Sequence, residues 1–163
     1  MTGVRGEIRH APYVRLAPRG TDIDALAALW TASWQAVMPS IDFAARRDWF
    51  CGYVTTLEAQ GAETICAFDG ARLLGFMLLN RQRGILEQIA VRPEFFGAGI
   101  GLRLVDAAKG LCPNGLALDV NADNPRALRF YEKAGFERRQ AGVNPRSGLK
   151  TWRMHWLGPS GSL

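Results

Sequence analysis

The stretch that decides the fold is Ile89-Ala-Val-Arg-Pro-Glu-Phe-Phe-Gly-Ala-Gly-Ile-Gly-Leu102. An apolar segment runs into a turn, and glycines at positions 97, 99 and 101 then open an amphipathic segment. Glycine lets the backbone come close to a ligand, and the free N–H groups of a helix start carry the positive end of the helix dipole. The stretch therefore predicts a strand, a glycine loop and a helix that together receive a phosphate or a pyrophosphate.

Three interpretations of this loop compete. A dinucleotide-binding loop needs G-x-G-x-x-G directly after its strand and an acid about 20 residues later. Asp119 stands at that distance from Gly99, but Leu102 occupies the place of the third glycine and five residues separate the strand from the first glycine. A P-loop needs Gly-Lys-Ser/Thr, which the sequence lacks. A glycine-rich turn that binds nothing is the third interpretation, and the loop alone leaves it open.

A second informative block, LALDVNADNPRALRFYEKAGF, covers residues 116–136. Asn124 and Pro125 form a helix N-cap and N1 pair, and Gly135 is a typical C-cap. Tyr131 follows Ala127 by four residues, so helical spacing alone makes it a core tyrosine. Each of these residues has a structural explanation when it is taken singly. Their joint occurrence, in this order after the glycine loop, favours a function.

Together the two blocks resemble motifs A and B of the GNAT superfamily of N-acetyltransferases. The residues that match motif A are Val91, Pro93, Glu94, Gly99 and Gly101. The residues that match motif B are Asn124, Ala127, Phe130, Tyr131, Glu132, Lys133, Gly135 and Phe136. Phe96 stands where the family has Gln or Arg, and the resemblance is weak before residue 72.

Periodicity along the chain agrees with an α/β fold. Strands are expected at 13–16, 64–68, 73–79, 85–91, 116–120, 136–140 and 151–157. Helices are expected from Thr21 or Asp22 to 34, and at 42–57, 99–109 and 124–134. The resemblance implies one GNAT-like domain over residues 1–163, with a mixed central sheet of about six to seven strands flanked by about four helices. Residues 21–60 would form the acceptor side, and 64–157 the acetyl-CoA-binding core.

The resemblance also implies acetyl-CoA as cosubstrate and assigns residues to it. Backbone groups of the strand would bind pantetheine like an added strand; these residues are Ile89, Ala90 and Val91. The loop and the helix start would bind the pyrophosphate through Phe96, Gly97, Ala98, Gly99, Ile100, Gly101 and Leu102. Asn124 would contact the pantetheine arm, and the Tyr131 hydroxyl would face the CoA sulfur as general acid.

Acetyl transfer to an amine needs a neutral nitrogen, so a carboxylate must take a proton directly or through water. Glu87 and Asp119 lie on the two strands that flank the expected cleft, and the sequence leaves both open as the base. Trp34 and Met38 are candidates on the acceptor side, where core packing is the competing explanation. The expected reaction is direct attack, in a ternary complex, by a primary amine of a small molecule or peptide. The alternatives are a non-catalytic acyl-CoA sensor and a dinucleotide-binding module.

Composition bounds the class of protein. The 163 residues are 48% hydrophobic and 21% charged, which is ordinary for one globular domain. No apolar run approaches the ~20 residues of a membrane helix, and the charged N-terminus is unlike a secretory signal. We therefore expect a soluble, cytoplasmic monomer or homodimer without a membrane partner.

The net charge and the positions of the cysteines and histidines indicate which classes of ligand the protein binds. The net charge is +5, and residues 85–163 hold eleven basic and seven acidic side chains. A mild excess without a dense basic cluster suits an anionic small molecule and argues against nucleic acid. Cys51, Cys66 and Cys112 lie far apart, as do His10 and His155, so we expect no metal site.

Overall fold

The computed structural model describes residues 14–20 and 22–159. In this part of the chain, seven strands form one mixed sheet in the order β1-β2-β3-β4-β5-β7-β6. The strands are β1 (Arg15–Pro18), β2 (Glu63–Asp69), β3 (Arg72–Asn80), β4 (Ile85–Val91), β5 (Leu116–Asn121), β6 (Glu137–Val143) and β7 (Lys150–Trp156). The helices are α2 (Ile23–Val37), α3 (Arg47–Ala59), α4 (Ile100–Leu111) and α5 (Pro125–Lys133), with single 3-10 turns η1 (Ala44–Arg46) and η2 (Pro93–Phe95). The predicted α/β fold is confirmed.

Element boundaries differ from expectation at a few places. Tyr13, Thr21 and His10 lie outside the described residues, and Asp22 caps α2 by accepting a hydrogen bond from the Ala25 N–H (3.1 Å). The helix expected from position 42 is interrupted, because the η1 turn precedes α3. None of the helices in the described part is both long and apolar enough to cross a bilayer.

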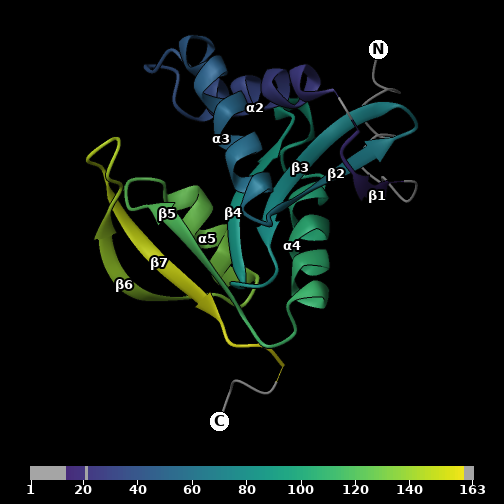
Figure 1. Ribbon diagram of the computed structural model, residues 1–163. Coiled ribbons are helices and arrows are strands. Elements are labelled where there is room, and N and C mark those ends of the chain that lie inside the picture. Colours follow the sequence, from purple (N-terminus) through teal and green to yellow (C-terminus); the bar gives the residue numbers. More distant parts are fainter. Residues whose placement is uncertain (1–13, 21, 160–163) are drawn as a thin grey trace.

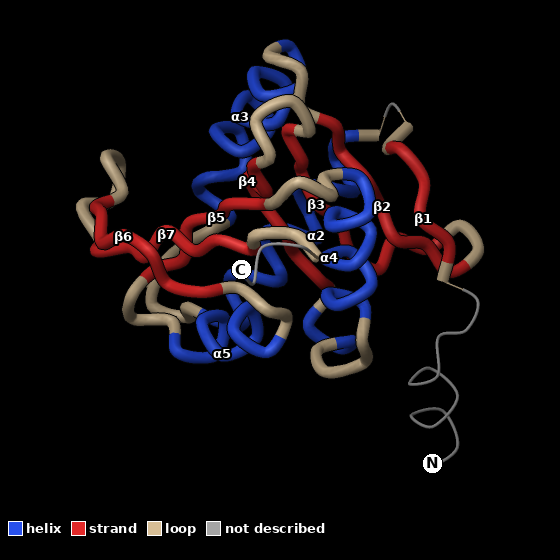
Figure 2. Tube along the Cα trace, turned by 90° about the horizontal axis from the view of Figure 1, so that it is seen from below, coloured by secondary structure: helices blue, strands red, loops and turns tan. Residues whose placement is uncertain are grey.

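Helices cover both faces of the sheet, and β3 separates the two cores that result (Figure 1, Figure 2). Met77 and Leu79 pack into the core shared with α4 and α5, whereas Phe76 and Leu78 pack into the core beneath α2 and α3. Successive side chains of a strand point to opposite faces. The continuous apolar run of β3 therefore reflects burial on both faces.

The sheet opens between β4 and β5, the only neighbouring strands of the described sheet that run parallel. Their ladder consists of the single register pair Ile85 and Ala117, supported by the Ala117 N–H donating to the Gly84 carbonyl oxygen (2.8 Å). On the other side of β4, the register with β3 shifts so that Glu87 has no partner residue. Such a β-bulge bends a strand and redirects its side chains. Beyond this point β4 and β5 diverge and leave a cleft.

Candidate active site

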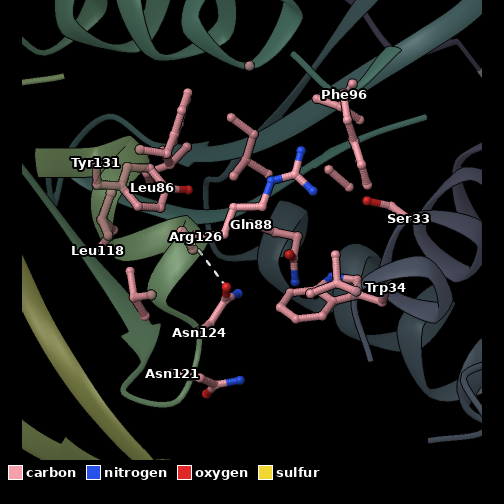
Figure 3. A pocket seen from close by; sticks show the side chains of 18 of the residues that line it. Ser33, Trp34, Leu86, Gln88, Phe96, Leu118, Asn121, Asn124, Arg126 and Tyr131 are labelled. Carbon is pink, nitrogen blue, oxygen red and sulfur yellow. Dashed lines mark hydrogen bonds between the residues drawn. The ribbon is translucent and has the colours of Figure 1, made fainter. Parts of the chain in front are cut away.

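The cleft has a volume of about 790 Å³ and extends from the β4–α4 loop across the gap between β4 and β5 to helices α2 and α3. Figure 3 shows side chains from both sides pointing into it, with Tyr131 opposite Ser33 and Trp34. Strands β4 and β5, helix α5, helices α2 and α3 and the β6–β7 loop all contribute to its walls. It therefore joins the predicted cosubstrate loop to the predicted acceptor side.

The glycine loop is open toward the cleft. Gly97 and Gly99 have φ angles of +80° and +88°, and a Cβ at either position would meet nothing within 4 Å. Gly99 is the N-cap of α4 and provides no side-chain cap, so the first N–H groups of that helix lack an intrahelical acceptor. An anion is the natural partner for such a helix start.

Gly101 has a different role from its two neighbours. Its φ is not positive, and a Cβ there would lie 3.3 Å from Cζ of Phe130. Glycine at this position lets α4 pack closely against α5. Only its backbone N–H is available to a ligand.

Most residues predicted to bind the cosubstrate meet in this one cleft. The residues that line it are Ile89, Ala90, Val91, Phe96, Gly97, Gly99, Ile100, Gly101, Leu102, Asn124 and Tyr131. Ala98 does not line it: the Ala98 N–H donates to the Phe95 carbonyl oxygen (3.0 Å), and its methyl group packs on the core.

A guanidinium group lies beside Phe96, the residue at which the sequence differs from motif A. Cζ of Arg126 stacks over the Phe96 ring at 4.4 Å from its centre, and both residues line the cleft (Figure 3). Arg126, Arg129 and Lys133 all face the cleft along α5, and within the described residues none of them forms an ion pair. A cation in the first turn of a helix opposes the dipole, so Arg126 is poorly placed for stability alone.

Tyr131 projects from α5 with its ring packed edge-on against Phe130 and Phe136 at 5.0 and 5.7 Å. The residue is only 7% exposed, and Figure 3 shows its hydroxyl pointing toward the middle of the cleft. Burial raises the pKa of Tyr131. The phenol is therefore protonated at neutral pH and can donate a hydrogen bond or a proton.

The two candidate bases lie in different environments. Asp119 binds Arg153 with both oxygens, at 2.7 and 3.0 Å, across the β5–β7 pair. Glu87 sits on the β4 bulge and is partly buried, and burial raises the pKa of its carboxyl group. Both line the cleft, but only Glu87 keeps oxygens without an ion-pair partner in the described chain.

The end of the cleft that is predicted to hold the acceptor is aromatic. Trp34 lines it as predicted, together with Trp49 and Tyr53 from α3. Met38 does not: it is the C-cap of α2 and packs against the core beneath that helix. The Tyr53 hydroxyl donates to the Glu87 carbonyl oxygen (3.4 Å), which supports the bulge from the α3 side.

No group of three or more His, Cys, Asp or Glu is placed to hold a metal ion between residues 14 and 159, position 21 excepted. Cys66 and Cys112 are buried, and burial raises the pKa of both thiols, which makes them poor nucleophiles. Metal-free chemistry stays a prediction.

Comparison with known proteins agrees with this geometry. The model of the acetyltransferase (GNAT) family matches residues 23–136. The chain belongs to the GNAT acetyltransferase family. This GNAT chain is 31% identical over 112 residues to the peptidyl-lysine N-acetyltransferase YjaB of Salmonella typhimurium, an alignment that covers 69% of this chain and 74% of the relative. The predicted resemblance is confirmed, and the chain is an acyltransferase.

Solved GNAT structures share the fold. Apo YjaB from Escherichia coli superposes with a TM-score of 0.71 at 23% identity, covering 89% of this chain and 98% of that one. The PaiA N-acetyltransferase of Thermoplasma acidophilum, solved in complex with coenzyme A, superposes with a TM-score of 0.70 at 17% identity, covering 88% and 98%. At these identities the likeness extends to the fold.

Among the residues that line the cleft of this GNAT chain and that sequence reasoning missed are Tyr53, Arg126 and Arg146. Arg126 carried a usable signal, because a cation in the first turn of a helix is electrostatically unfavourable. Tyr53 and Arg146 carried none, since their places depend on how α3 and the β6–β7 loop pack around the cleft.

Proposed function

We propose that the protein is an acetyl-CoA-dependent N-acetyltransferase that transfers the acetyl group to a primary amine by direct attack in a ternary complex. One observation carries the proposal. A single cleft is lined by the open glycine loop, Tyr131 and Glu87.

The shape of the cleft supports acetyl-CoA binding. Beyond Ile85, the backbone of β4 has no ladder partner on the β5 side and offers a strand edge to the pantetheine amides. The N–H groups at the start of α4 suit the pyrophosphate, and Arg126 adds a cation beside them. Phe96 occupies the position at which the family has Gln or Arg, and the Arg126 stacked on it supplies a polar group there instead.

The residues of the cleft suit each step of acetyl transfer. Glu87 takes one proton from the ammonium group, directly or through water, and passes it to solvent. The neutral nitrogen attacks the thioester carbonyl carbon, a C–N bond forms, and the C–S bond breaks as the tetrahedral intermediate collapses. Tyr131 gives its proton to the departing thiolate and recovers one from the nitrogen through solvent. The net products are the amide, CoA thiol and one proton.

Glu87 is preferred to Asp119 as the base because both Asp119 oxygens are bound by Arg153. A carboxylate accepts a proton only when ionised, so activity should rise as pH increases through the raised pKa of Glu87. Glu87→Gln should lower kcat by roughly 10²-fold or more and flatten the acid limb of the pH profile. If the limb survives in Glu87→Gln and disappears in Asp119→Asn, the assignment is wrong.

The acceptor is proposed only as a class. The relative named peptidyl-lysine N-acetyltransferase supports a peptide or protein amine, and the aromatic acceptor end equally suits a small amine with an apolar body. A cytoplasmic location, and a monomer or homodimer as the working form, stay part of the same proposal.

The test combines binding with turnover. Acetyl-CoA at ~100 times its dissociation constant should add about 2.7 kcal/mol to the free energy of unfolding and raise the melting temperature by several degrees. A shift with NAD and none with acetyl-CoA would make the protein a dinucleotide-binding module. Binding of acetyl-CoA without thiol release on a panel of polyamines, amino acids, aminoglycosides and peptides would make it a sensor.

A further inference from the structure

The acceptor end of the cleft contains a guanidinium group without an acidic partner in the part of the chain that the structure describes. Cζ of Arg146 lies 4.6 Å from the ring centre of Trp49 and 5.4 Å from that of Tyr53. These two rings stack on each other at 5.0 Å and 19°. All three residues line the cleft.

The β6–β7 loop is built to hold Arg146 in this place. The Asn144 Oδ1 accepts hydrogen bonds from the backbone N–H groups of Arg146 (2.9 Å) and Ser147 (3.3 Å). The Gly148 N–H donates to the Asn144 carbonyl oxygen (2.8 Å). Stacking occupies the face of the guanidinium, so its N–H donors, which point outward in the plane, stay available.

Tyr53 connects this cation to the proposed base. The Tyr53 hydroxyl donates a hydrogen bond to the Glu87 carbonyl oxygen, and the Arg146 guanidinium lies over the Tyr53 ring. Burial raises the pKa of Tyr53 to about 12, with Glu87 adding to the shift and Arg146 opposing it. Both charges therefore act on the Tyr53 phenol, and the guanidinium lies over the face of its ring.

Cations outnumber anions around this part of the cleft. A smaller adjoining pocket of about 240 Å³ shares Glu87 and Asp119 with the main cleft and adds Arg83 and Arg153. The charge of Arg153 is balanced by its ion pair with Asp119. Two positive charges, Arg146 and Arg83, then remain for the single negative charge of Glu87. This excess opposes a second positive charge on an acceptor and favours a negative one.

We propose that the acceptor is a primary amine with an apolar chain and a terminal oxyanion such as a carboxylate. The amine lies at Glu87, the chain runs along Trp49 and Tyr53, and the oxyanion binds the planar fork of Arg146. This inference rests on the proposed acetyltransferase function and names the substrate class of its acceptor site.

The test uses three amines of equal chain length that differ only in their far end: δ-aminovalerate (negative), pentylamine (neutral) and cadaverine (positive). We expect kcat/KM to fall in that order, with δ-aminovalerate preferred over pentylamine by roughly two- to fivefold, because Arg146 is exposed and solvent screens its pairing with a carboxylate. NMR titration of the Trp49 indole N–H, with and without CoA, ranks their binding independently of turnover.

Three variants separate Arg146 from general charge effects. Arg146→Ala should reduce the preference to near unity, and Arg146→Glu should reverse it in favour of cadaverine. Arg139→Ala is the matched control, because Arg139 is on the same hairpin and pairs with Glu137 outside the cleft (2.9 Å). It should keep the parental order.

The inference would be overturned if the parent protein used or bound cadaverine as well as δ-aminovalerate. It would also be overturned if the Arg146→Ala variant kept the parental order of preference among the three amines. Failure of the proposed function looks different. In that case acetyl-CoA does not raise the melting temperature, and none of the three amines releases thiol, whatever their order of binding.

Discussion

Tyr131 illustrates how one side chain serves both core and site. Its ring packs between Phe130 and Phe136, while its hydroxyl faces the cleft. The hydrophobic spacing on α5 and the proposed acid role are therefore compatible, because they involve different atoms of the same residue.

Tyr131→Phe removes the hydroxyl and little volume, so it tests the acid role directly. We expect kcat to fall by roughly 10²–10⁴-fold, with acetyl-CoA affinity nearly unchanged. The CoA thiol has a pKa of about 8.5, like that of cysteine. The defect should shrink at high pH, where the thiolate leaves without help. Stopped-flow thiol release across pH measures this, and parental kcat in a folded variant would make Tyr131 purely a core residue.

The Phe96–Arg126 stack makes a second prediction for single residues. Arg126→Ala should weaken acetyl-CoA binding by roughly tenfold, since a charge-assisted hydrogen bond to phosphate is lost. S-acetyl-pantetheine, which has no pyrophosphate, should bind both proteins equally. Phe96→Leu should weaken acetyl-CoA binding less, and the double variant should show non-additive losses because the two residues touch. Calorimetry measures these affinities, with Arg139→Ala as the control. If Arg126→Ala lost as much affinity for S-acetyl-pantetheine as for acetyl-CoA, the pyrophosphate role would be refuted.

At the scale of elements, the N-terminus of α5 combines a structural role with a proposed role in ligand binding. Asn124 caps the helix by accepting from the Ala127 N–H (3.2 Å), and it also lines the cleft. The cap uses the carbonyl oxygen of the amide. The NH2 group remains for a ligand.

Substitutions at Asn124 should separate these roles. Asn124→Asp keeps the cap and favours the helix dipole, so the melting temperature should be retained while acetyl-CoA affinity falls. Asn124→Ala loses both functions and about 1 kcal/mol of stability. Thermal unfolding with and without acetyl-CoA measures both effects. Parental affinity in Asn124→Asp would show that the NH2 group donates nothing to the ligand.

At the scale of the whole molecule, an ion pair attaches the edge of the sheet to helix α3. Arg19 follows β1 and binds Glu58 of α3 through Nε (2.8 Å) and Nη2 (2.6 Å), and Glu58 also accepts from the Thr64 hydroxyl of β2 (2.8 Å). The hydrogen bond from Arg19 lowers the pKa of Glu58, against the effect of burial. The Glu58 carboxylate thus joins α3 to β2, which follows it directly in the sequence, and to the chain after β1, 39 residues earlier.

This network predicts a pH-dependent stability. Because the folded-state pKa of Glu58 lies below its ordinary value of 4.5, its contribution is present above that value and is lost as pH falls through the lowered pKa. Glu58→Gln should lower the melting temperature at pH 7, and the difference from the parent should vanish in acid. Glu137→Gln removes an exposed pair and should change little. An undiminished difference in acid would show that the effect comes from packing.

Local sequence signals determined much of this protein. The glycine loop, the Asn124 cap and the strand of residues 85–91 depend on neighbouring residues, so glycine freedom, capping chemistry and periodicity predict them. The family resemblance rests on the same two blocks. The residues of those blocks that were predicted to bind the cosubstrate accordingly meet in one cleft, with Ala98 as the exception.

Tertiary structure alone decided the details on which the chemistry depends. The proposed choice of Glu87 over Asp119 as the base rests on two features: the register shift of β4 against β3 at Glu87, and the position of Arg153 on β7 opposite Asp119. Both features are set by pairing between strands. Arg126 reaches Phe96, and Arg146 reaches Trp49, only because loops and helices converge at the gap between β4 and β5. Met38, a predicted candidate on the acceptor side, lies at the end of α2 and does not line the cleft. Such contacts depend on long-range packing, for which the sequence near each residue has no periodic or capping signal.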